Sequence, residues 1–433
     1  MNLEAWLALL ERRHPRAIEL GLERCGAVYR DLGSPRPAKQ VFTVAGTNGK
    51  GSTVAYLAAM SGGLGRRYGT YTSPHIFRFN ERISVMGEAV PDDCLVRAFE
   101  QVEAARNDVS LTYFEFTTLA GLLILQQAHL DCAVLEVGLG GRLDAVNLVD
   151  ADCAVITPIG LDHQDFLGPD LNSIAAEKAG IIRPGVPVVC TQMYPPVPIL
   201  RQAESLQAPL YRRGIDYDLV EYPGLGDELL QFSLGGRSMA VPRPAMVGEH
   251  QRDNLAAALA AFALLHPADC FESNKILDAI RSVRVPGRLQ KVASSPEILL
   301  DVGHNELAAE VVADFLECSG KKGVTCVLAM LVDKHAEEVA VELGRVCKRW
   351  LCASTPGARG QSGESLAQRL KTVLPDAEII AFAQLDAALQ EAVASQKGDE
   401  TILVFGSFMT AAAAADWVQN SMQHDCHDAA KIT

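Results

Sequence analysis

The chain has 433 residues, and at about 150 residues per domain this length predicts two or three domains. Hydrophobic residues make up 48% and charged residues 21% of the chain, as in ordinary globular proteins, so a largely disordered chain is excluded. The formal net charge of −14 repels phosphate backbones and argues against nucleic acid as a partner. An anionic ligand therefore needs a local site built from helix N-termini, a few Lys or Arg side chains, or a metal.

The eleven cysteines are scattered and form no CxxC pair, which supports neither a zinc ribbon nor a disulfide framework. Several lie in apolar runs, such as Cys153 and Cys326, where a thiol serves as a small hydrophobic side chain. This usage fits a reducing compartment. The N-terminus lacks the basic segment and apolar core of a signal peptide, and the apolar stretches fall short of the ~20 residues that a membrane helix needs. We therefore expect a soluble, cytoplasmic protein without a membrane association.

In the first half of the chain, short β-branched segments alternate with longer helical patterns, which predicts parallel sheets in an α/β fold. The expected helices are two within residues 3–32, separated at His14-Pro15, one over residues 52–64 and one over residues 114–130, the last buried on most sides. The expected strands are residues 40–45, 68–72, 132–137, 153–159 and 186–191.

Residues 193–245 carry many prolines and short alternating segments, which indicate a small antiparallel sheet or an excursion from the domain. Helices over residues 251–265 and 273–283 follow. A second series of strands, each followed by a helical pattern, is expected at residues 298–302, 324–331, 350–354, 378–382 and 401–405. This layout predicts a separate doubly wound domain. We place the boundary near residues 286–292, with a P-loop-type ATPase domain over residues 1–288 and a smaller Rossmann-like domain over residues 289–433.

The strongest local motif is VFTVAGTNGKGST at residues 41–53, where a hydrophobic strand enters a glycine-rich loop and then a helix. Backbone N–H groups of such a loop form an anion-binding nest, and Lys50 adds a charge for the β- and γ-phosphates. The spacing departs from the standard Walker motif, because Val44 stands at the first glycine and Gly51 separates the lysine from Ser52. We favour phosphate binding over an ordinary glycine-rich turn. The candidate ATP-binding residues of the loop are Thr47, Asn48, Gly49, Lys50, Gly51, Ser52 and Thr53.

Four further residues suit phosphate or metal chemistry to different degrees. Glu136 ends the apolar run CAVLEVG, where a carboxylate needs a partner, so a cation is favoured there over a salt-bridged glutamate. His163 follows another apolar strand, and its residue type alone favours a hydrogen-bonded loop histidine, since Mg²⁺ prefers oxygen. Lys178 lies on an apolar predicted helix and, from sequence alone, reaches solvent or pairs with Glu177. Arg288 in a Pro-Gly-Arg turn is either a surface side chain or a hinge arginine for a γ-phosphate.

Seven separated motifs follow the loop in order: YTSPH (71–75), LEVGLGGRLDA (135–145), LDH (161–163), EKAGI (177–181), HQRDN (250–254), PGR (286–288) and DVGHN (301–305). Over about residues 1 to 420 this series resembles the folylpolyglutamate synthase/dihydrofolate synthase family, within the Mur-ligase-like group of ATP-dependent amide ligases. Glu306 stands where family members often carry proline, which bears on the rigidity of that loop and leaves its polar residues in place.

The resemblance implies an ATP- and Mg²⁺-dependent ligase that joins L-glutamate to dihydropteroate and to the glutamate tail of tetrahydrofolates through an acyl phosphate. It implies two Mg²⁺ sites and a further monovalent cation, with metal ligands Ser73, Glu136, His163 and Lys178, the lysine carbamylated by CO₂. The implied catalytic residues are Lys50, Lys178, Arg288 and His304. Asn254, Arg288 and Asp301 are the implied ATP contacts beyond the loop, and Asp301, His304 and Ser407 the implied L-glutamate site.

The segment LTYFEF at residues 111–116 resembles the dihydropteroate-contacting stretch of the two-activity bacterial enzymes. Tyr113 and Phe114 would cover a flat pterin ring, and Thr112 and Glu115 would read its edge nitrogens. The alternative is the start of a buried helix with its aromatic side chains in the core. The GLER segment at residues 21–24 also resembles the bifunctional branch and favours two activities. The remaining implied pterin residues are Leu143, Asp144 and Ala145.

Three alternatives differ in activity. The first is a folylpolyglutamate synthase without the dihydropteroate reaction. The second is a cell-wall amino-acid ligase of the Mur type, disfavoured because the phosphate loop starts at residue 46 and leaves no room for an extra N-terminal domain. The third is a GTP-hydrolysing switch, disfavoured because no NKxD-like segment follows the loop at a suitable distance. The expected partners are small molecules (dihydropteroate, folates, L-glutamate and ATP), and a monomer is expected.

Overall fold

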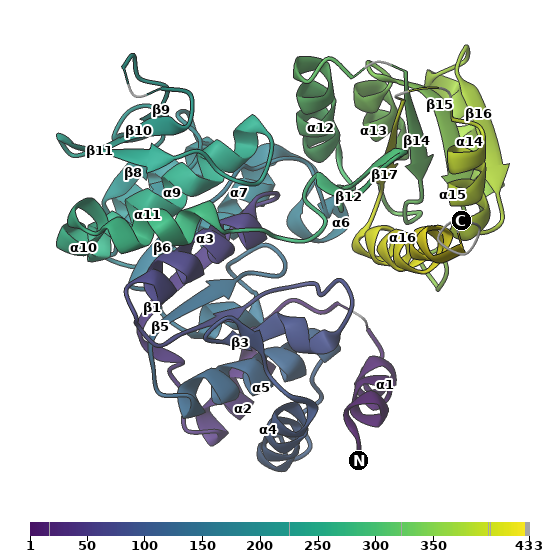
Figure 1. Cartoon of the computed structure of the whole chain (residues 1–433). Helices are drawn as coiled ribbons and strands as arrows, with labels where there is room; N and C mark the ends of the chain where they lie inside the picture. Colours follow the sequence, from purple (N-terminus) through teal and green to yellow (C-terminus); the bar gives the residue numbers. More distant parts are fainter. Residues whose placement is uncertain (17, 225, 322, 397, 399, 429–433) are drawn as a thin grey trace. The chain divides into compact units, whose positions relative to one another are not determined.

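The computed structural model describes residues 1–16, 18–224, 226–321, 323–396, 398 and 400–428 (Figure 1). The chain divides into two compact units. The first comprises Met1–Ala245 and His250–Arg284, and the second comprises Met246–Glu249 and Val285–Thr433. Each unit has a large, mostly parallel β-sheet of its own, so the predicted α/β architecture is confirmed. In the described part of the chain, no helix has the length and apolar character needed to cross a bilayer.

The first unit is built on an eight-stranded sheet in the order β4-β3-β2-β5-β1-β6-β7-β8. The six neighbouring strands β2, β5, β1, β6, β7 and β8 pair in parallel. At one edge, β3 pairs antiparallel with β2, and β4 pairs antiparallel with β3. The strands are β1 (Ala38–Ala45), β2 (Tyr68–Tyr71), β3 (Ile83–Val85), β4 (Glu88–Ala89), β5 (Leu130–Glu136), β6 (Cys153–Ile156), β7 (Val188–Cys190) and β8 (Leu210–Arg212).

Helices cover this sheet, and α3 and α5 pack directly on its central strands. The apolar core under α5 includes Val41, Ala133 and Leu135, alternate residues that point to one face of β1 and β5. The helices are α1 (Leu3–Arg13), α2 (Glu23–Asp31), α3 (Lys50–Gly63), α4 (Asp92–Ala105), α5 (Tyr113–Gln127), α6 (Gln164–Leu167), α7 (Leu171–Ala179), α8 (Val197–Ser205), α9 (Glu249–Leu265), α10 (Pro267–Glu272) and α11 (Asn274–Arg281), with 3-10 turns η1 (Phe79–Arg82) and η2 (Ala145–Leu148).

The proline-rich region forms the predicted antiparallel sheet, in the order β11-β10-β9. Its strands are β9 (Tyr217–Val220), β10 (Leu229–Leu234) and β11 (Arg237–Pro242). Along β10 buried and half-buried residues alternate, which is the two-residue period of a strand with one face on a core.

The second unit is doubly wound, as predicted. Its sheet has the order β12-β13-β17-β14-β15-β16, parallel except where β12 pairs with β13. Helices α12 to α14 pack on one face, and α15 and α16 on the other. The elements are β12 (Gln290–Ser294), β13 (Glu297–Leu300), α12 (Glu306–Cys318), β14 (Val324–Leu328), α13 (Ala336–Leu343), β15 (Cys347–Ala353), α14 (Gly363–Val373), β16 (Glu378–Phe382), α15 (Leu385–Ala394), β17 (Thr401–Phe405) and α16 (Phe408–Asp428).

The structure corrects several expected element bounds. The helix expected over residues 114–130 ends at Gln127, because His129 takes a left-handed conformation (φ 50°) and β5 starts at Leu130. The strands expected to run to residues 159 and 331 end earlier, at Ile156 and Leu328.

Candidate functional site

Four neighbouring parallel strands bring most of the predicted residues of the first unit to one edge of its sheet. In the order β2-β5-β1-β6, Tyr71 pairs with Leu135, Val44 with Glu136 and Ala45 with Ile156. The segments that follow these strands carry Ser73, Glu136, the glycine-rich loop and His163. They therefore leave the sheet at the same carboxyl edge, the position at which open α/β sheets bind their ligands.

The glycine-rich loop between β1 and α3 has the geometry of a phosphate site. Gly49 precedes α3 with φ 84°, a conformation that favours glycine. A Cβ atom there would lie 2.4 Å from Asn254 Oδ1, so the predicted ATP residue Asn254 packs directly on the loop. Lys50 Nζ donates to the carbonyls of Gly46 (3.1 Å) and Thr47 (3.0 Å), which places its charge over the loop.

The loop hydroxyls differ in what remains available to a ligand. Thr53 Oγ1 donates to the Gly49 carbonyl (3.0 Å), and Thr47 Oγ1 bonds with both backbone groups of Gly160. Ser52 Oγ is buried, and among the described residues it has no hydrogen-bond partner. A buried hydroxyl without a partner is costly, and a phosphate oxygen or a hydrated metal would satisfy it. This position fits the predicted ATP and Mg²⁺.

Ser73 and Glu136, two predicted metal ligands, are neighbours. The Ser73 N–H lies 3.4 Å from Glu136 Oε2, and Glu136 is buried at the end of β5. Phe114 packs against the next turn, because a Cβ on Gly138 would lie 2.5 Å from its ring and 3.3 Å from Ser73 Oγ. The structure thus brings one predicted pterin residue to the predicted metal ligands.

Lys178 on α7 points into the same edge. Its side chain is buried, and Nζ donates to the Gly46 carbonyl at 2.7 Å. Burial, together with the positive charge of Lys50, lowers the pKa of Lys178 from 10.5 to about 7. The expectation from sequence alone, a lysine that reaches solvent or pairs with Glu177, is wrong, because Glu177 pairs with Arg142 instead.

His163 is half-buried and lies next to Asp162, with Nε2 3.9 Å from an Asp162 oxygen. Asp162 is buried, and its negative charge favours the charged form of Lys178. Asp162 therefore couples the segment after β6 to the lysine electrostatically. Within the described residues, no group of three or more His, Cys, Asp or Glu side chains is arranged to hold a metal ion. Ser73, Glu136 and Asp162 nevertheless supply the hard oxygen donors that suit Mg²⁺.

The glycine-rich turn after β5 ends at Asp144, a predicted pterin residue. Asp144 is fully buried and accepts the N–H groups of Leu139 (2.8 Å) and Val146 (2.9 Å), which fixes the turn. Burial raises its pKa to about 6. Ala145 is buried and Leu143 half-buried beside it.

The four predicted pterin residues at the start of α5 fall into two pairs. Thr112 and Glu115 form a capping box: Thr112 Oγ1 accepts the Glu115 N–H (3.2 Å), and Glu115 Oε2 accepts the Thr112 N–H (2.8 Å). The half-buried Tyr113 and Phe114 lie between them. The capping atoms are thus committed to the helix start, and a pterin contact from Thr112 or Glu115 stays a prediction.

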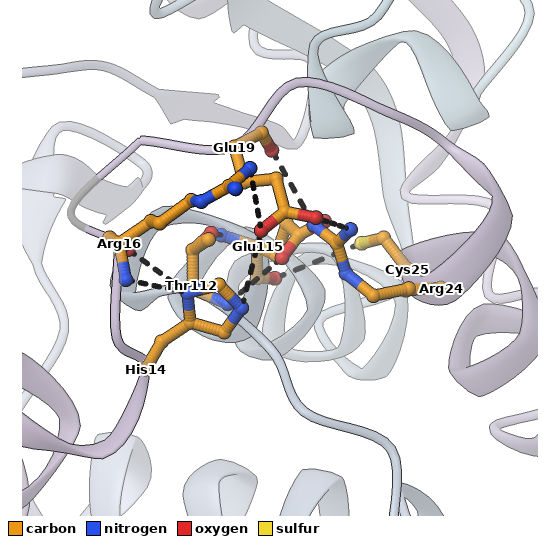
Figure 2. A network of polar contacts seen from close by, with 7 residues as sticks. All are labelled: His14, Arg16, Glu19, Arg24, Cys25, Thr112 and Glu115. Carbon is orange, nitrogen blue, oxygen red and sulfur yellow. Dashed lines mark hydrogen bonds and ion pairs between the residues drawn. The ribbon is translucent and has the colours of Figure 1, made fainter.

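This helix start is tied to the N-terminal segment (Figure 2). Arg24 donates to Glu115 Oε1 (3.0 Å) and also pairs with Glu19. His14 lies 3.7 Å from Glu19, and the Cys25 thiol donates to the Glu115 carbonyl. Glu19 and the start of α2 are therefore connected to the N-terminus of α5.

In the second unit, the predicted glutamate residues meet at the carboxyl ends of β13 and β17, which are paired neighbours. Asp301 is buried, accepts the N–H groups of Leu289 (2.9 Å) and Gly303 (2.7 Å), and has a pKa raised by that burial. Ser407 Oγ accepts the Thr410 N–H (3.0 Å) in the first turn of α16. The ring of Phe408 then contacts both the guanidinium of Arg288, at 5.4 Å, and the ring of His304, at 6.4 Å.

Sequence reasoning missed two residues, Asp162 and Gln251, that support the candidate site of the first unit. Asp162 lies within the LDH motif, and its carboxylate favours a nearby cation more than His163 does. Gln251 is buried, and its Oε1 accepts the Asn254 amide at 3.1 Å, which orients Asn254 against the loop. Gln251 lies three residues before Asn254 in the predicted helix, and residues at this spacing share one helix face, so the spacing could have indicated the contact.

Comparisons with known proteins identify the family of the chain. The Mur ligase middle domain matches residues 44–189, and the Mur ligase glutamate ligase domain matches residues 287–408. The chain is 41% identical to the dihydrofolate synthase/folylpolyglutamate synthase of Escherichia coli K12 over 95% of this chain and 94% of that protein.

Two solved structures extend the match to the fold. E. coli FolC in complex with DHPP and ADP has a TM-score of 0.89 and 40% identity, covering 97% of this chain and 98% of that one. A bifunctional folylpolyglutamate synthase/dihydrofolate synthase with Mn, AMPPNP and L-glutamate bound has a TM-score of 0.86 and 37% identity, covering 97% and 98%.

Proposed function

Because the chain belongs to the dihydrofolate synthase/folylpolyglutamate synthase family of Mur ligases, we propose that it ligates L-glutamate to dihydropteroate and to the glutamate tail of tetrahydrofolates. The observation that carries this proposal is the carboxyl edge of the first sheet. There a phosphate loop, two oxygen donors and a buried lysine converge, and the loop carries a buried hydroxyl with no hydrogen-bond partner in the described part of the chain. We assign ATP and pterin binding to residues 1–288 and glutamate binding to residues 289–433.

The reaction would proceed in two steps. A substrate carboxylate oxygen attacks the γ-phosphorus of ATP, the bond to the β-phosphate oxygen breaks, and ADP leaves. The glutamate amine then attacks the carbonyl carbon of this acyl phosphate, phosphate leaves, and the amine loses a proton. Both steps join anions, so positioning and charge neutralisation supply most of the acceleration. Lys50 in the loop and Arg288 at the start of the second unit are the cations assigned to this task.

We assign Ser73, Glu136 and His163 to Mg²⁺ binding, with a monovalent cation as a further occupant. The oxygen donors of Ser73 and Glu136 suit Mg²⁺, and His163 rests on the family likeness. Bound Mg²⁺ would neutralise charge on the phosphate and carboxylate oxygens. The chain's own part is to hold these donors at the ends of β2 and β5, next to the loop.

Lys178 is proposed to act as a carbamate. Its lowered pKa leaves a large neutral fraction at neutral pH. The lone pair of neutral Nζ attacks the carbon of dissolved CO₂, an N–C bond forms, one C=O π pair moves to oxygen, and a proton leaves to water. The product is a carboxylate on a lysine stem, and it adds a hard oxygen donor to the metal ligands.

For L-glutamate we propose a site formed by Asp301, His304 and Ser407, with Arg288 close by. The substrate carries two carboxylates and an amine. A helix N-terminus with a hydroxyl suits a carboxylate, and the buried carboxylate of Asp301 suits the amine. For the pterin, the half-buried rings of Tyr113 and Phe114 offer apolar and edge-to-face contacts.

One assay tests the function. ADP release is measured with ATP, Mg²⁺ and L-glutamate in the presence of dihydropteroate, then tetrahydrofolate, then neither. Glutamate-dependent release with both acceptors supports the proposal. If only tetrahydrofolate supports glutamate-dependent ADP release, the protein is a folylpolyglutamate synthase without the dihydropteroate reaction. If neither acceptor supports it, both assignments are overturned. Product mass separates true ligation from uncoupled ATP hydrolysis.

We propose that the enzyme works in the cytoplasm as a monomer on these small molecules, without nucleic acid. The ten cysteines that the structure describes are free thiols, and most of them are buried, which suits a reducing compartment. Light scattering with and without ATP checks the oligomeric state.

A further inference from the structure

The turn after β5 packs directly on the last turn of α7, which carries Lys178. The Arg142 N–H donates to the Glu177 carbonyl at 2.7 Å. A Cβ atom on Gly141 would lie 2.7 Å from the same carbonyl and 3.0 Å from the Lys178 Cα. A Cβ on Gly180 would lie 2.3 Å from Arg142 Cβ. This backbone contact leaves no room for a side chain, so the turn defines where the end of α7 lies.

One buried amide connects the two segments. Asn147 in η2 is 8% exposed, and its Nδ2 donates to the Arg142 carbonyl (3.1 Å) and to the Gly180 carbonyl (3.0 Å). Arg183 holds this amide in place, because its Nη2 donates to Asn147 Oδ1 (2.9 Å) and Nη1 donates to the Gly180 carbonyl (3.1 Å).

The bonds to the Gly180 carbonyl fix the chain two residues after Lys178. The last carbonyls of a helix lack partners within the helix, so the groups that bond to them determine how its last turn is fixed. Gly180 follows the last residue of α7, two residues after Lys178. The lysine stem then runs to the Gly46 carbonyl, at the phosphate loop.

We propose that Asn147 is a positioning residue for the ligase reaction, which acts through the Gly180 and Arg142 carbonyls to hold Lys178 at the phosphate loop. The inference rests on the role proposed above for Lys178 and extends it to a residue that lies outside the phosphate loop. Removal of such a supporting group typically costs about 10- to 100-fold in metal affinity or activity.

The test compares Asn147→Ala with the wild-type enzyme in three measurements: kcat, KM for ATP, and the ¹³C NMR signal of a Lys178 carbamate in ¹³C-bicarbonate. We expect kcat to fall about 10- to 100-fold, KM for ATP to change little, and the carbamate signal to weaken. Raised bicarbonate should recover part of the signal, because carbamylation is an equilibrium with CO₂.

Two matched variants separate positioning from general loss of stability. Asn80→Ala removes an equally buried amide that also donates two hydrogen bonds, to the Val90 carbonyl (2.7 Å) and Asp92 (2.8 Å). Asp150→Asn removes an exposed partner of Arg183 that touches neither carbonyl. Both should keep the carbamate signal of the wild type. If Asn147→Ala does not fold, Asn147→Asp keeps the side-chain volume and the Arg183 contact but removes both donors.

A wild-type carbamate signal and kcat in Asn147→Ala would overturn the proposal, as would an equal loss of signal in Asn80→Ala. The role of Lys178 is tested separately with Lys178→Ala. If that variant is fully active, the proposed function of Lys178 fails and the positioning role fails with it. If the wild type shows no carbamate while Lys178→Ala is inactive, only carbamylation fails. The positioning role then stands if kcat of Asn147→Ala falls at unchanged KM for ATP, and it fails if kcat stays at the wild-type value.

Discussion

Replacing Lys178 with methionine should stabilise the ligand-free protein at neutral pH. The folded-state pKa of about 7 lies below the ordinary value of 10.5, so folding favours the uncharged amine. At about 1.4 kcal/mol for each tenfold change in proton affinity, burial of this lysine costs about 4 kcal/mol of unfolding free energy at pH 7. Methionine has a similar length and no charge. It loses the hydrogen bond to the Gly46 carbonyl, worth about 1 kcal/mol, which leaves a net gain of about 3 kcal/mol.

The pH dependence identifies the cause. Between pH 7 and 10.5 the unfolded chain binds more protons at Lys178 than the folded chain, so wild-type stability rises with pH in that window. Below about pH 7 the penalty is complete and constant. At pH 9 about 2 kcal/mol of it remains, so the advantage of Lys178→Met should shrink by about 2 kcal/mol between pH 7 and pH 9.

The assay is urea unfolding in CO₂-free buffer without ATP, followed by peptide-resolved hydrogen exchange over α5 and α7, so that the first unit is observed by itself. Lys39→Met is the matched control, because the Lys39 side chain is 79% exposed. The difference in unfolding free energy between Lys39→Met and the wild type should not shrink by about 2 kcal/mol between pH 7 and pH 9. A Lys178→Met advantage that is absent, or constant from pH 7 to pH 9, would refute the reasoning.

Three further outcomes concern activity. Lys50→Ala should abolish ATP turnover in a protein with wild-type circular dichroism, because the change removes the charge over the loop while the helices and strands keep their own packing; normal turnover would exclude the phosphate site. His304→Ala and Ser407→Ala should raise KM for glutamate at least about tenfold, the cost of about one charge-assisted hydrogen bond, with KM for ATP nearly unchanged; the reverse pattern would move glutamate elsewhere. Tyr113→Ala and Phe114→Ala should reduce dihydropteroate ligation more than tetrahydrofolate glutamylation, and equal losses would argue against a dedicated pterin site.

The sequence predicted the parts of the site that depend on local pattern. A strand that ends in a glycine-rich turn places Lys50 at a helix start, and an apolar run that ends in Glu136 places a carboxylate at a sheet edge. The Thr112-x-x-Glu115 spacing is equally local, and as a capping-box signature it could have indicated the helix start. In each case residues within one turn or one strand determine the geometry.

The parts that the sequence did not predict depend on distant contacts. Lys178 reaches Gly46 across 132 positions of the chain, and Arg24 reaches Glu115 across 91. No local pattern distinguishes that buried lysine from one that reaches solvent. The edge strands β3 and β4 have three and two residues, too few for an alternating pattern, and they form because β2 offers an unpaired edge.

The charges at the carboxyl edge explain why this site needs a metal. Glu136 and Asp162 contribute buried carboxylates, and Asp144 adds a third that is mostly ionised at neutral pH. With a pKa of about 7, Lys178 is charged only about half of the time at neutral pH, so Lys50 is the main positive charge of this group. An ATP molecule would add several negative charges, and a carbamate on Lys178 would add one more. The edge then carries a clear excess of negative charge in a poorly solvated place, which is unfavourable unless divalent cations bind with the nucleotide. Metal and ATP binding are therefore expected to be strongly coupled, each raising the affinity of the other by the same factor.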